Sequence, residues 1–360
     1  MTPSVIRPEY NRVNLLTRMG VRLNGGNWTT FVRRIEYDAK GQRKRIDYGN
    51  GASAAYDYDP LTFRLVRLVT ERDRNAFPGD CPDPQDGGWP GCHLQNLHYT
   101  YDPVGNIVHI RDEAQQTIYF RNKRVDPSAS FTYDPVYRLV EATGREHVGQ
   151  AGGVPHIHSP HDEPRTGIRW SANDGNAMAP YVERYVYDDA GNLLEMRHLS
   201  GLTNAGWTRR FEYKEKSLIE DGTDGGPLMF GNRLGASGTG AGDQETERYV
   251  YDAHGNMIRM PHLGGVHPGP NMHWDCRDRL IRTDLGGGGK AFYVYDSAGN
   301  RVRKVWEKSE TLIEERLYFA GFEIFRRRTA ADGIVLERET LHVMADKLRI
   351  AMVETRTVDK

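Results

Sequence analysis

The side chains with the strongest metal-ligand character lie together in the segment PHIHSPHDEP. It holds His156, His158, His161, Asp162 and Glu163, and these donor types suit zinc or nickel. The segment is flanked by Pro and lies in the longest insertion of the chain, which favours a surface loop over a fixed coordination geometry. We therefore predict no metal site and no bound cofactor.

Two other segments match phosphate-binding or catalytic motifs only in part. The run Gly286-Gly-Gly-Gly-Lys290 has Asp284 where a phosphate-binding loop requires Gly, and Ala291 where it requires Ser or Thr. After Ser237, Thr239 replaces the second Gly of a nucleophile elbow. No pair of carboxylates is placed by sequence alone for glycoside hydrolysis. The sequence predicts no catalytic residue, so we expect a protein that is not an enzyme.

A repeated string, Tyr-Asp-x-x-Gly-Asn, is the dominant feature of the chain. Four copies begin at Tyr101, Tyr187, Tyr251 and Tyr295, and a looser copy, YDAKGQ, begins at Tyr37. Asp followed by Gly three places later suits a type I turn that ends in a left-handed residue, and such turns close β-hairpins. The residues that define the repeat are Tyr37, Asp38, Gly41, Tyr101, Asp102, Gly105, Asn106, Tyr187, Asp188, Gly191, Asn192, Tyr251, Asp252, Gly255, Asn256, Tyr295, Asp296, Gly299 and Asn300.

The residues around each copy predict a strand before the turn and another after it. An aromatic or branched residue stands two places before each Tyr, as Tyr99 does before Tyr101, and so shares its strand face. A second version without Gly reads YDPLTFRLVRLVT, YDPVYRLVEATG and WDCRDRLIRTD, with aromatic-Asp-x-x-x-Arg-Leu as the expected common core. Residues 211–213 and 318–321 look like eroded copies. We expect about ten strand-turn-strand units in an all-β fold, a long curved antiparallel sheet.

Composition sets the limits for other functions. The chain of 360 residues is 38% hydrophobic with a mean hydropathy of −0.68, which predicts a thin core. A net charge of −1 and a pI near 6.9 leave no electrostatic footprint for nucleic acid. No apolar stretch is long enough for a membrane span, and the first residues lack the apolar region of a signal peptide.

Three cysteines are too few for a disulfide scaffold. Cys81 and Cys92 bracket a Pro- and Gly-rich loop, and either a bridge or a reduced pair fits the sequence. Cys276 takes a position in a degenerate repeat, where we expect it to be buried.

We expect a single repeat array over residues 1–360, with loop insertions near 77–93, 146–180, 221–244 and 261–271. Repeat-like sequence reaches both ends without a polar capping unit, although open arrays need caps. This favours a piece of a larger assembly, or a chain that pairs with another.

The repeats resemble those of the rearrangement-hotspot (Rhs) or YD-repeat family. LHYTYDPVGNIVHIRDEAQQTIYF, at 97–120, and YVYDSAGNRVRKVWE, from 293, are similar to the repeat region of the insecticidal toxin-complex (Tc) B and C components and of SpvB-associated Rhs proteins. The resemblance covers nearly all of the chain. It implies hairpins that wind into a hollow shell around a toxic polypeptide, in a secreted or bacterial cell-associated toxin assembly. The implied partners are the remainder of the shell and an enclosed toxin segment.

One family feature does not carry over. The family ends in a core with a self-cleavage motif of the DPxG type and a variable toxin. Here Asp102-Pro103-Val104-Gly105 has that spelling only inside a repeat turn, so neither self-proteolysis nor toxin activity is implied. The sequence therefore predicts a non-enzymatic structural shell segment. The alternative is a cell-surface adhesion or carbohydrate-binding module, in which rows of Tyr and Trp would contact sugars.

Overall fold

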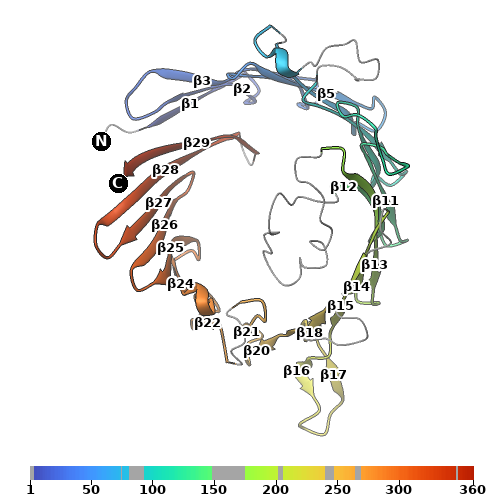
Figure 1. The fold of residues 1–360 in the computed structure, drawn as a ribbon, viewed down its shortest axis with the longest axis vertical. Helices are drawn as coiled ribbons and strands as arrows, with labels where there is room; N and C mark the ends of the chain where they lie inside the picture. Colours follow the sequence, from blue (N-terminus) through green and yellow to red (C-terminus); the bar gives the residue numbers. More distant parts are fainter. Residues whose placement is uncertain are drawn as a thin grey trace. The chain divides into compact units, whose positions relative to one another are not determined.

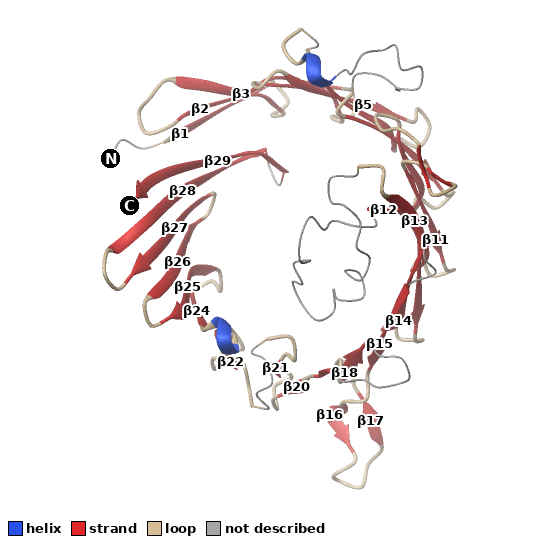
Figure 2. Cartoon of the chain, viewed as in Figure 1, coloured by secondary structure: helices blue, strands red, loops and turns tan. Residues whose placement is uncertain are grey.

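The computed structural model describes residues 4–73, 75–80, 93–147, 175–201, 206–239, 247–263, 269–345 and 348–360. Strands and the turns between them make up almost all of these residues (Figure 2). Two single-turn 3-10 helices, η1 (Pro78–Asp80) and η2 (Gly286–Gly288), are the helical exceptions in this part of the chain. The prediction of an all-β fold is confirmed.

Contacts divide the chain into two compact units. The first reaches Val186 and also takes Met196–Trp207, and the second takes Tyr187–Glu195 and continues from Thr208 to Lys360. The boundaries therefore fall inside β13 (Met178–Tyr187), β14 (Leu193–Ser200) and β15 (Gly206–Glu212). The expectation of a single array over the whole chain stays a prediction.

In the first unit, antiparallel strands pair almost entirely in chain order, from β1 through β8 and then β11, β12 and β13. Figure 1 shows this sheet bending between β3 and β13. A separate pair, β9 and β10, lies between β8 and β11 in the chain. The bounds are β1 (Val5–Tyr10), β2 (Leu16–Arg22), β3 (Trp28–Tyr37), β4 (Arg43–Tyr48), β5 (Ala52–Tyr58), β6 (Leu65–Arg72), β7 (Gln95–Tyr101), β8 (Ile107–Asp112), β9 (Ile118–Phe120), β10 (Lys123–Val125), β11 (Ser128–Tyr133) and β12 (Leu139–His147).

In the second unit, β15, β18 and β19 pair in that order, and β22 to β29 form a sheet in strict chain order. The pairs β16–β17 and β20–β21 are separate hairpins. Two short strands, β17 and β18, form inside the expected loop insertion at 221–244. The bounds are β16 (Lys216–Asp221), β17 (Leu228–Phe230), β18 (Ala236–Gly238), β19 (Glu247–Arg248), β20 (Val250–Tyr251), β21 (Met257–Arg259), β22 (Met272–Trp274), β23 (Leu280–Asp284), β24 (Lys290–Tyr295), β25 (Arg301–Ser309), β26 (Leu312–Phe319), β27 (Phe322–Thr329), β28 (Gly333–Ala345) and β29 (Leu348–Asp359).

The apolar core is thin. The largest side chains that are essentially fully buried are valines, among them Val21, Val32 and Val343. A buried row crosses β3, β4 and β5, where Ile35 lies opposite Ile46 and Ile46 opposite Ala54. Burial of such small side chains contributes only modestly to stability, so other contacts must hold successive hairpins together.

Each repeat is a β-hairpin with a bulge at a fixed place. In the hairpin of Tyr101, Thr100 lies opposite His109 and Tyr101 opposite Ile107, so Val108 is an extra residue in the second strand. We call the residue opposite the aromatic one, here Ile107, the return residue. The extra residue follows the return residue in eight hairpins of the described chain. These extra residues are Thr17, Lys44, Val66, Val108, Val140, Ile258, Ile281 and Val302.

Successive hairpins are joined by one recurring inter-hairpin hydrogen bond. In hairpins of both units the aromatic side chain donates to a backbone carbonyl of an earlier hairpin, and in six of them that carbonyl belongs to the return residue. In the first unit the Tyr37 hydroxyl donates to Leu16 O at 2.6 Å, Tyr58 to Arg43 O at 3.0 Å, Tyr101 to Leu65 O at 2.7 Å and Tyr133 to Ile107 O at 2.9 Å. In the second unit Tyr251 donates to Leu234 O, the Trp274 indole to Met257 O and Tyr295 to Leu280 O, at 2.8–2.9 Å.

A cation reinforces this contact in some hairpins. The guanidinium of Arg64 lies 5.6 Å from the centre of the Tyr101 ring and donates to the Asp102 carbonyl at 3.0 Å. Arg279 contacts Tyr295 and the Asp296 carbonyl in the same way, at 5.5 Å and 3.3 Å. The Arg-Leu pair, whose Leu is the first residue of β6 or β23, thus offers the next hairpin a cation from Arg and a carbonyl from Leu.

The first prediction concerns the inter-hairpin hydrogen bond. Tyr101→Phe keeps the ring and removes the hydroxyl donor to Leu65 O, so the free energy of unfolding should fall by about 1 kcal/mol. The measurement is chemical denaturation followed by circular dichroism. Tyr119→Phe is the matched control, because Tyr119 is 74% exposed and its hydroxyl makes no hydrogen bond within the described residues. Equal midpoints for the two variants would contradict this role of Tyr101.

Candidate functional site

The turn of each repeat is held by its Asp carboxylate. In the Tyr101 hairpin the Asp102 N–H donates to Asn106 O at 3.0 Å, and Gly105 N–H donates to Asp102 O at 3.2 Å. The Asp102 carboxylate accepts from the backbone N–H groups of Gly105 and Asn106, at 2.7 Å and 2.8 Å, and from the Asn106 amide at 2.8 Å. Gly105 has φ of 113°, a conformation that disfavours a side chain. Every residue type of the string therefore has a structural task in the turn.

The same arrangement recurs in the other copies. The side chain of Asn donates to the turn carboxylate at Asp188, Asp252 and Asp296, over 2.8–3.2 Å. At Asp38 the carboxylate accepts from the Gln42 backbone at 2.9 Å. Positive φ is found at Gly41, Gly191, Gly255 and Gly299. The residues of the string thus lie in separate turns along the array rather than in one shared cleft.

The copies without Gly use a different residue for each task. Tyr137 and Asp278 adopt positive φ in the place of Gly, at 67° and 56°. The Nε of Arg138 donates to the Asp134 carboxylate at 2.6 Å, and that of Arg279 to the Asp275 carboxylate at 2.8 Å. Arg therefore replaces the amide of Asn as the donor that closes the turn.

The hairpin of Tyr58 corrects the expected common core of these copies. Its turn has four residues between Asp and Arg instead of three, with Asp59 N–H donating to Arg64 O and Phe63 N–H to Asp59 O, both at 2.9 Å. The extra residue is accommodated by a wider turn, in which Phe63 adopts φ of 59°. The longer turn still places Arg64 and the carbonyl of Leu65 where the next hairpin uses them.

The structure contains one hairpin of the repeat that the sequence analysis did not identify. Residues 1–34 contain none of the strings found in the sequence, but Tyr10 ends β1 as the aromatic residue of a further hairpin, with Leu16 opposite it. Asn11 takes the place of the turn Asp and accepts from the N–H groups of Val13 and Leu15, at 3.1 Å and 2.9 Å. Asn14, with φ of 61°, replaces Gly. The signal was present as Tyr-Asn-x-x-Asn, because Asn can do the work of both residues.

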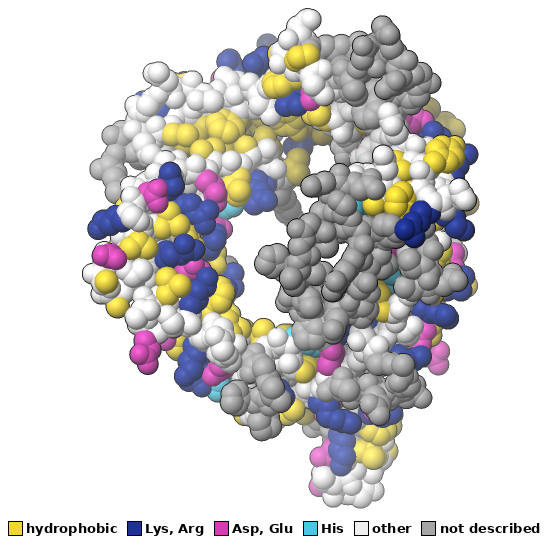
Figure 3. All heavy atoms as spheres, viewed as in Figure 1, with side chains coloured by type: hydrophobic (Ala, Val, Ile, Leu, Met, Phe, Trp, Pro, Cys, Tyr) yellow, Lys and Arg dark blue, Asp and Glu magenta, His cyan; other side chains and the backbone are white. Residues whose placement is uncertain are grey.

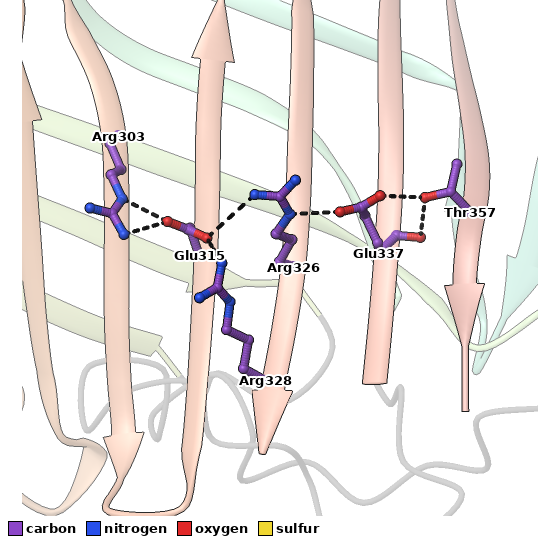
Figure 4. A network of polar contacts seen from close by, with 6 residues as sticks. All are labelled: Arg303, Glu315, Arg326, Arg328, Glu337 and Thr357. Atoms are coloured by element: carbon purple, nitrogen blue, oxygen red, sulfur yellow. Dashed lines mark hydrogen bonds and ion pairs between the residues drawn. The ribbon is translucent and has the colours of Figure 1, made fainter. Parts of the chain in front are cut away.

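Ion pairs cross the strands of the second unit. A network visible in Figure 4 runs over β25 to β29 and consists of Arg303, Glu315, Arg326, Arg328, Glu337 and Thr357. The Glu315 side chain is 5% exposed and accepts from Arg303 at 2.6 Å and from Arg328 at 2.9 Å. Arg326 lies directly opposite both Glu315 and Glu337 and donates to Glu337 at 2.6 Å. Each buried carboxylate is neutralised by a cation, as its burial requires.

The alternate residues of these strands carry a second set of ion pairs. Glu314 binds Lys308 at 3.0 Å and Arg327 at 2.9 Å, and Glu323 binds Arg316 at 2.6 Å. Figure 3 shows basic, acidic and apolar side chains interspersed over β24 to β28. The sheet therefore presents a mixed, largely neutralised surface rather than an acid–base centre.

His198 in the first unit contacts four side chains. Its ring lies 5.5 Å from the ring centres of both Tyr181 and Trp207, stacked against each. The ring nitrogens of His198 contact Glu146 and Glu183, each at 3.1 Å. The hydrogen bond and charge of Glu146, followed by those of Glu183, hold the pKa of His198 above 6.5 despite its burial. The imidazole thus joins β14 to β12 and β13.

The segment around Ser237 forms a buried polar cluster in the second unit. The Ser237 hydroxyl, fully buried, donates to Glu247 at 2.6 Å and lies 3.1 Å from the Tyr249 hydroxyl. Tyr249 in turn lies 2.8 Å from His262 Nε2, and Arg209 donates to Glu247 at 2.7 Å. A serine that is fully buried and hydrogen-bonded to a carboxylate has no room for a substrate carbonyl, so the cluster is structural.

The remaining candidates have these outcomes. The His156–Glu163 segment and the pair Cys81 and Cys92 lie outside the described residues. Gly286–Gly288 forms η2, whose Gly288 carbonyl accepts from the Trp306 indole at 2.7 Å. Cys276 is exposed in its turn, contrary to the expected burial, because it occupies the outward corner after Asp275. The described residues contain no metal-ligand cluster and no helix that could span a membrane.

The second prediction concerns the turn carboxylates. The hydrogen bond from the Arg279 side chain is the main cause that lowers the pKa of Asp275 from 3.8 to about 2. The ionised Asp275 carboxylate therefore contributes stability above pH 3.8, and this contribution is lost as pH falls through 2. Arg279→Gln should move the Asp275 titration up towards 3.8, measured by carboxyl-carbon NMR. Arg277→Gln, in the same turn but without a side-chain bond to Asp275, should leave it unchanged. An unmoved titration in Arg279→Gln would refute this pairing.

The third prediction concerns His198. Because its folded pKa is raised, its stabilising contribution is complete below pH 6.5 and is lost as pH rises through the folded value. The unfolding midpoint of the native chain should therefore fall as pH rises above 6.5. His198→Gln should flatten this dependence, whereas His109→Gln, which removes a histidine outside the cluster, should keep it. A dependence of equal slope in both variants would show that another group titrates.

Comparison with known proteins extends the resemblance. No family model matches the chain. It is 28% identical over 365 residues to toxin subunit YenC1 of Yersinia entomophaga, covering 98% of this chain and 32% of YenC1. It is 24% identical over 335 residues to probable deoxyribonuclease RhsA of Dickeya dadantii, covering 84% of this chain and 20% of RhsA. The chain therefore spans about a third, or less, of the length of these relatives.

Solved structures share the fold. The Photorhabdus luminescens Tc holotoxin pore matches with a TM-score of 0.70 and 24% identity, over 99% of this chain and 15% of that chain. The crystal structure of TcdB2-TccC3 matches with a TM-score of 0.70 and 23% identity, over 100% of this chain and 16% of that one. The hairpin array and the relatives together show that the chain is similar to the repeat regions of Rhs and Tc proteins.

Proposed function

We propose that this chain is a non-enzymatic wall segment of an Rhs/Tc-type toxin shell, and that the shell encloses a toxic polypeptide. The observation that carries the proposal is the series of inter-hairpin hydrogen bonds, four in succession within the first unit. Each bond fixes one hairpin to its predecessor, so an array can lengthen without a deep core. Such construction suits a wall, in which area matters more than volume.

The chemistry of the strand faces supports a wall that does not hold its contents tightly. The carboxylates of Glu315, Glu337 and Glu314 are all paired with cations of neighbouring strands. These three carboxylates therefore carry little free charge with which to bind a passing polypeptide. We propose that the remainder of the shell, on the same or a partner polypeptide, and the enclosed toxin segment are the partners.

The names of the relatives are consistent with this role in part. YenC1 is named a toxin subunit, and one of the matched structures is named a Tc holotoxin pore with a TccC3 mutation. RhsA is named a probable deoxyribonuclease, but this chain matches only 20% of RhsA, and we propose no nuclease activity for it. A place in a secreted or bacterial cell-associated toxin assembly is part of the proposal.

The alternative, an adhesion or carbohydrate-binding module, fits the contacts less well. A sugar platform needs exposed aromatic rings with hydroxyls free to bond to the sugar. The hydroxyls of Tyr37, Tyr58, Tyr101, Tyr133, Tyr251 and Tyr295 instead donate to backbone carbonyls. Sugar binding by these side chains would have to break the array.

The fourth prediction tests enclosure. When the chain is co-expressed with the polypeptides encoded beside it, a toxic polypeptide should co-purify and resist a broad-specificity protease. The same polypeptide alone should be degraded, and so should the complex once denaturant opens the shell. Mass spectrometry of the surviving fragments is the measurement. Equal degradation of the polypeptide with and without the chain would overturn the proposal, and saturable binding of the chain to a glycan array would favour the adhesion module.

A further inference from the structure

Aromatic rings and cations share a row that crosses the strands from β24 to β28. The row consists of Tyr293, Lys304, Arg316, Phe325 and Arg338, which lie directly opposite one another in successive strands and so share one face of the sheet. Lys304 Nζ lies 6.0 Å from the centre of the Tyr293 ring. The guanidinium groups of Arg316 and Arg338 lie 5.5 Å and 4.8 Å from the centre of Phe325. Each cation is therefore held by an aromatic neighbour.

The two arginines of this row are neutralised, but its lysine is not. Arg316 forms an ion pair with Glu323 at 2.6 Å, and Arg338 forms one with Glu354 at 3.6 Å. The ammonium group of Lys304 forms no ion pair and no hydrogen bond with any residue that the structure describes. It is half-buried among aromatic rings, and its positive charge is open to an anion from another molecule.

A second cation beside Lys304 is in the same state. The exposed Arg301 lies 4.9 Å from the centre of the Tyr318 ring and 5.8 Å from that of Tyr293, and it has no carboxylate partner within the described ranges. Arg301 lies opposite Tyr295 in the ladder, and Lys304 lies opposite Tyr293. The two cations are thus two ladder positions apart, about 7 Å along the strand. This face of the sheet therefore carries two adjacent positive charges that are positioned by rings but not neutralised.

The spacing of the two cations fits an extended polypeptide better than a nucleic acid. Carboxylates on alternate residues of a strand lie on one face, about 7 Å apart, so each would meet one cation. A nucleic acid requires many phosphate contacts and free ring faces on which its bases stack. The chain has a net charge of −1, and the rings of Tyr293 and Tyr318 already contact cations. The complementary ligand is therefore an acidic peptide segment.

We propose that Arg301 and Lys304 form a docking site for an extended polypeptide segment that carries carboxylates on alternate residues, such as Glu-x-Glu. One carboxylate accepts from the Arg301 guanidinium and the other from the Lys304 ammonium, while Tyr293 and Tyr318 hold both cations in place. The two ion pairs remain open to solvent, so the contact is weak and sensitive to salt. A weak, reversible contact suits a wall that encloses a polypeptide, and this last step alone rests on the proposed function.

The fifth prediction uses the whole 360-residue chain and a short fluorescent peptide with Glu-Thr-Glu at its centre and Gly and Ser elsewhere. The peptide should bind saturably at low salt, measured by fluorescence anisotropy, and more weakly as salt is raised. Lys304→Gln and Arg301→Gln should each weaken binding about fivefold, the effect of one exposed ion pair, whereas Lys304→Arg should retain it. Lys290→Gln is the matched control, because Lys290 lies on β24 but on the opposite face of the sheet.

Four outcomes would overturn the docking site. They are the absence of saturable binding, an unchanged affinity in Lys304→Gln, an equal affinity for a peptide with Gln-Thr-Gln at its centre, and tighter binding of a single-stranded oligonucleotide at the same site. An unchanged unfolding midpoint will show that the Lys304→Gln variant folds. Failure of enclosure and failure of docking are distinguishable, because protease protection of a cargo is measured without the added peptide.

Discussion

A hydrogen bond from an aromatic side chain to a main-chain carbonyl is the interaction on which this fold depends. A two-stranded hairpin is at best marginally stable in water, and the core here is built mainly from small side chains such as Val21, Val32 and Ala54. The bond from Tyr101 to Leu65 O, and its counterparts, fixes the distance and register of neighbouring hairpins. The bulge after each return residue gives this carbonyl the same position every time, so the contact can be repeated.

Beyond the last inter-hairpin hydrogen bond, ion pairs between strands take the place of the aromatic contact. From β25 to β29 the turns no longer follow the repeat, and rows of opposite charges lie across the strands, as at Glu315 and Arg326. Opposite charges on facing positions favour one register over its neighbours. Burying Glu315 without Arg303 and Arg328 would be costly. The two parts of the array thus use different side chains to set strand pairing.

The sequence predicted the elements that are local in the chain. The Asp and Gly of Tyr-Asp-x-x-Gly-Asn specify the turn at Asp102 and Gly105 through backbone geometry, and strand alternation specifies the fold class. The acceptor of the tyrosine hydroxyl was not predictable in this way. It is a backbone carbonyl of another hairpin, which is the same for every residue type and so leaves no signal in the sequence. The contacts around His198 were not predicted for a related reason, since Glu146 lies 52 residues away in the sequence. The hairpin of Tyr10 was missed because Asn stands for both Asp and Gly.

The recurring bond also gives the ribbon a direction. Each donor comes later in the chain than its acceptor, as Tyr37 comes after Leu16 and Tyr58 after Arg43. A hairpin emerging from the ribosome therefore finds its binding partner already made and never has to wait for chain still to be translated. The array can close in the order of its synthesis, one unit at a time, with little unsatisfied strand exposed to aggregation on the way.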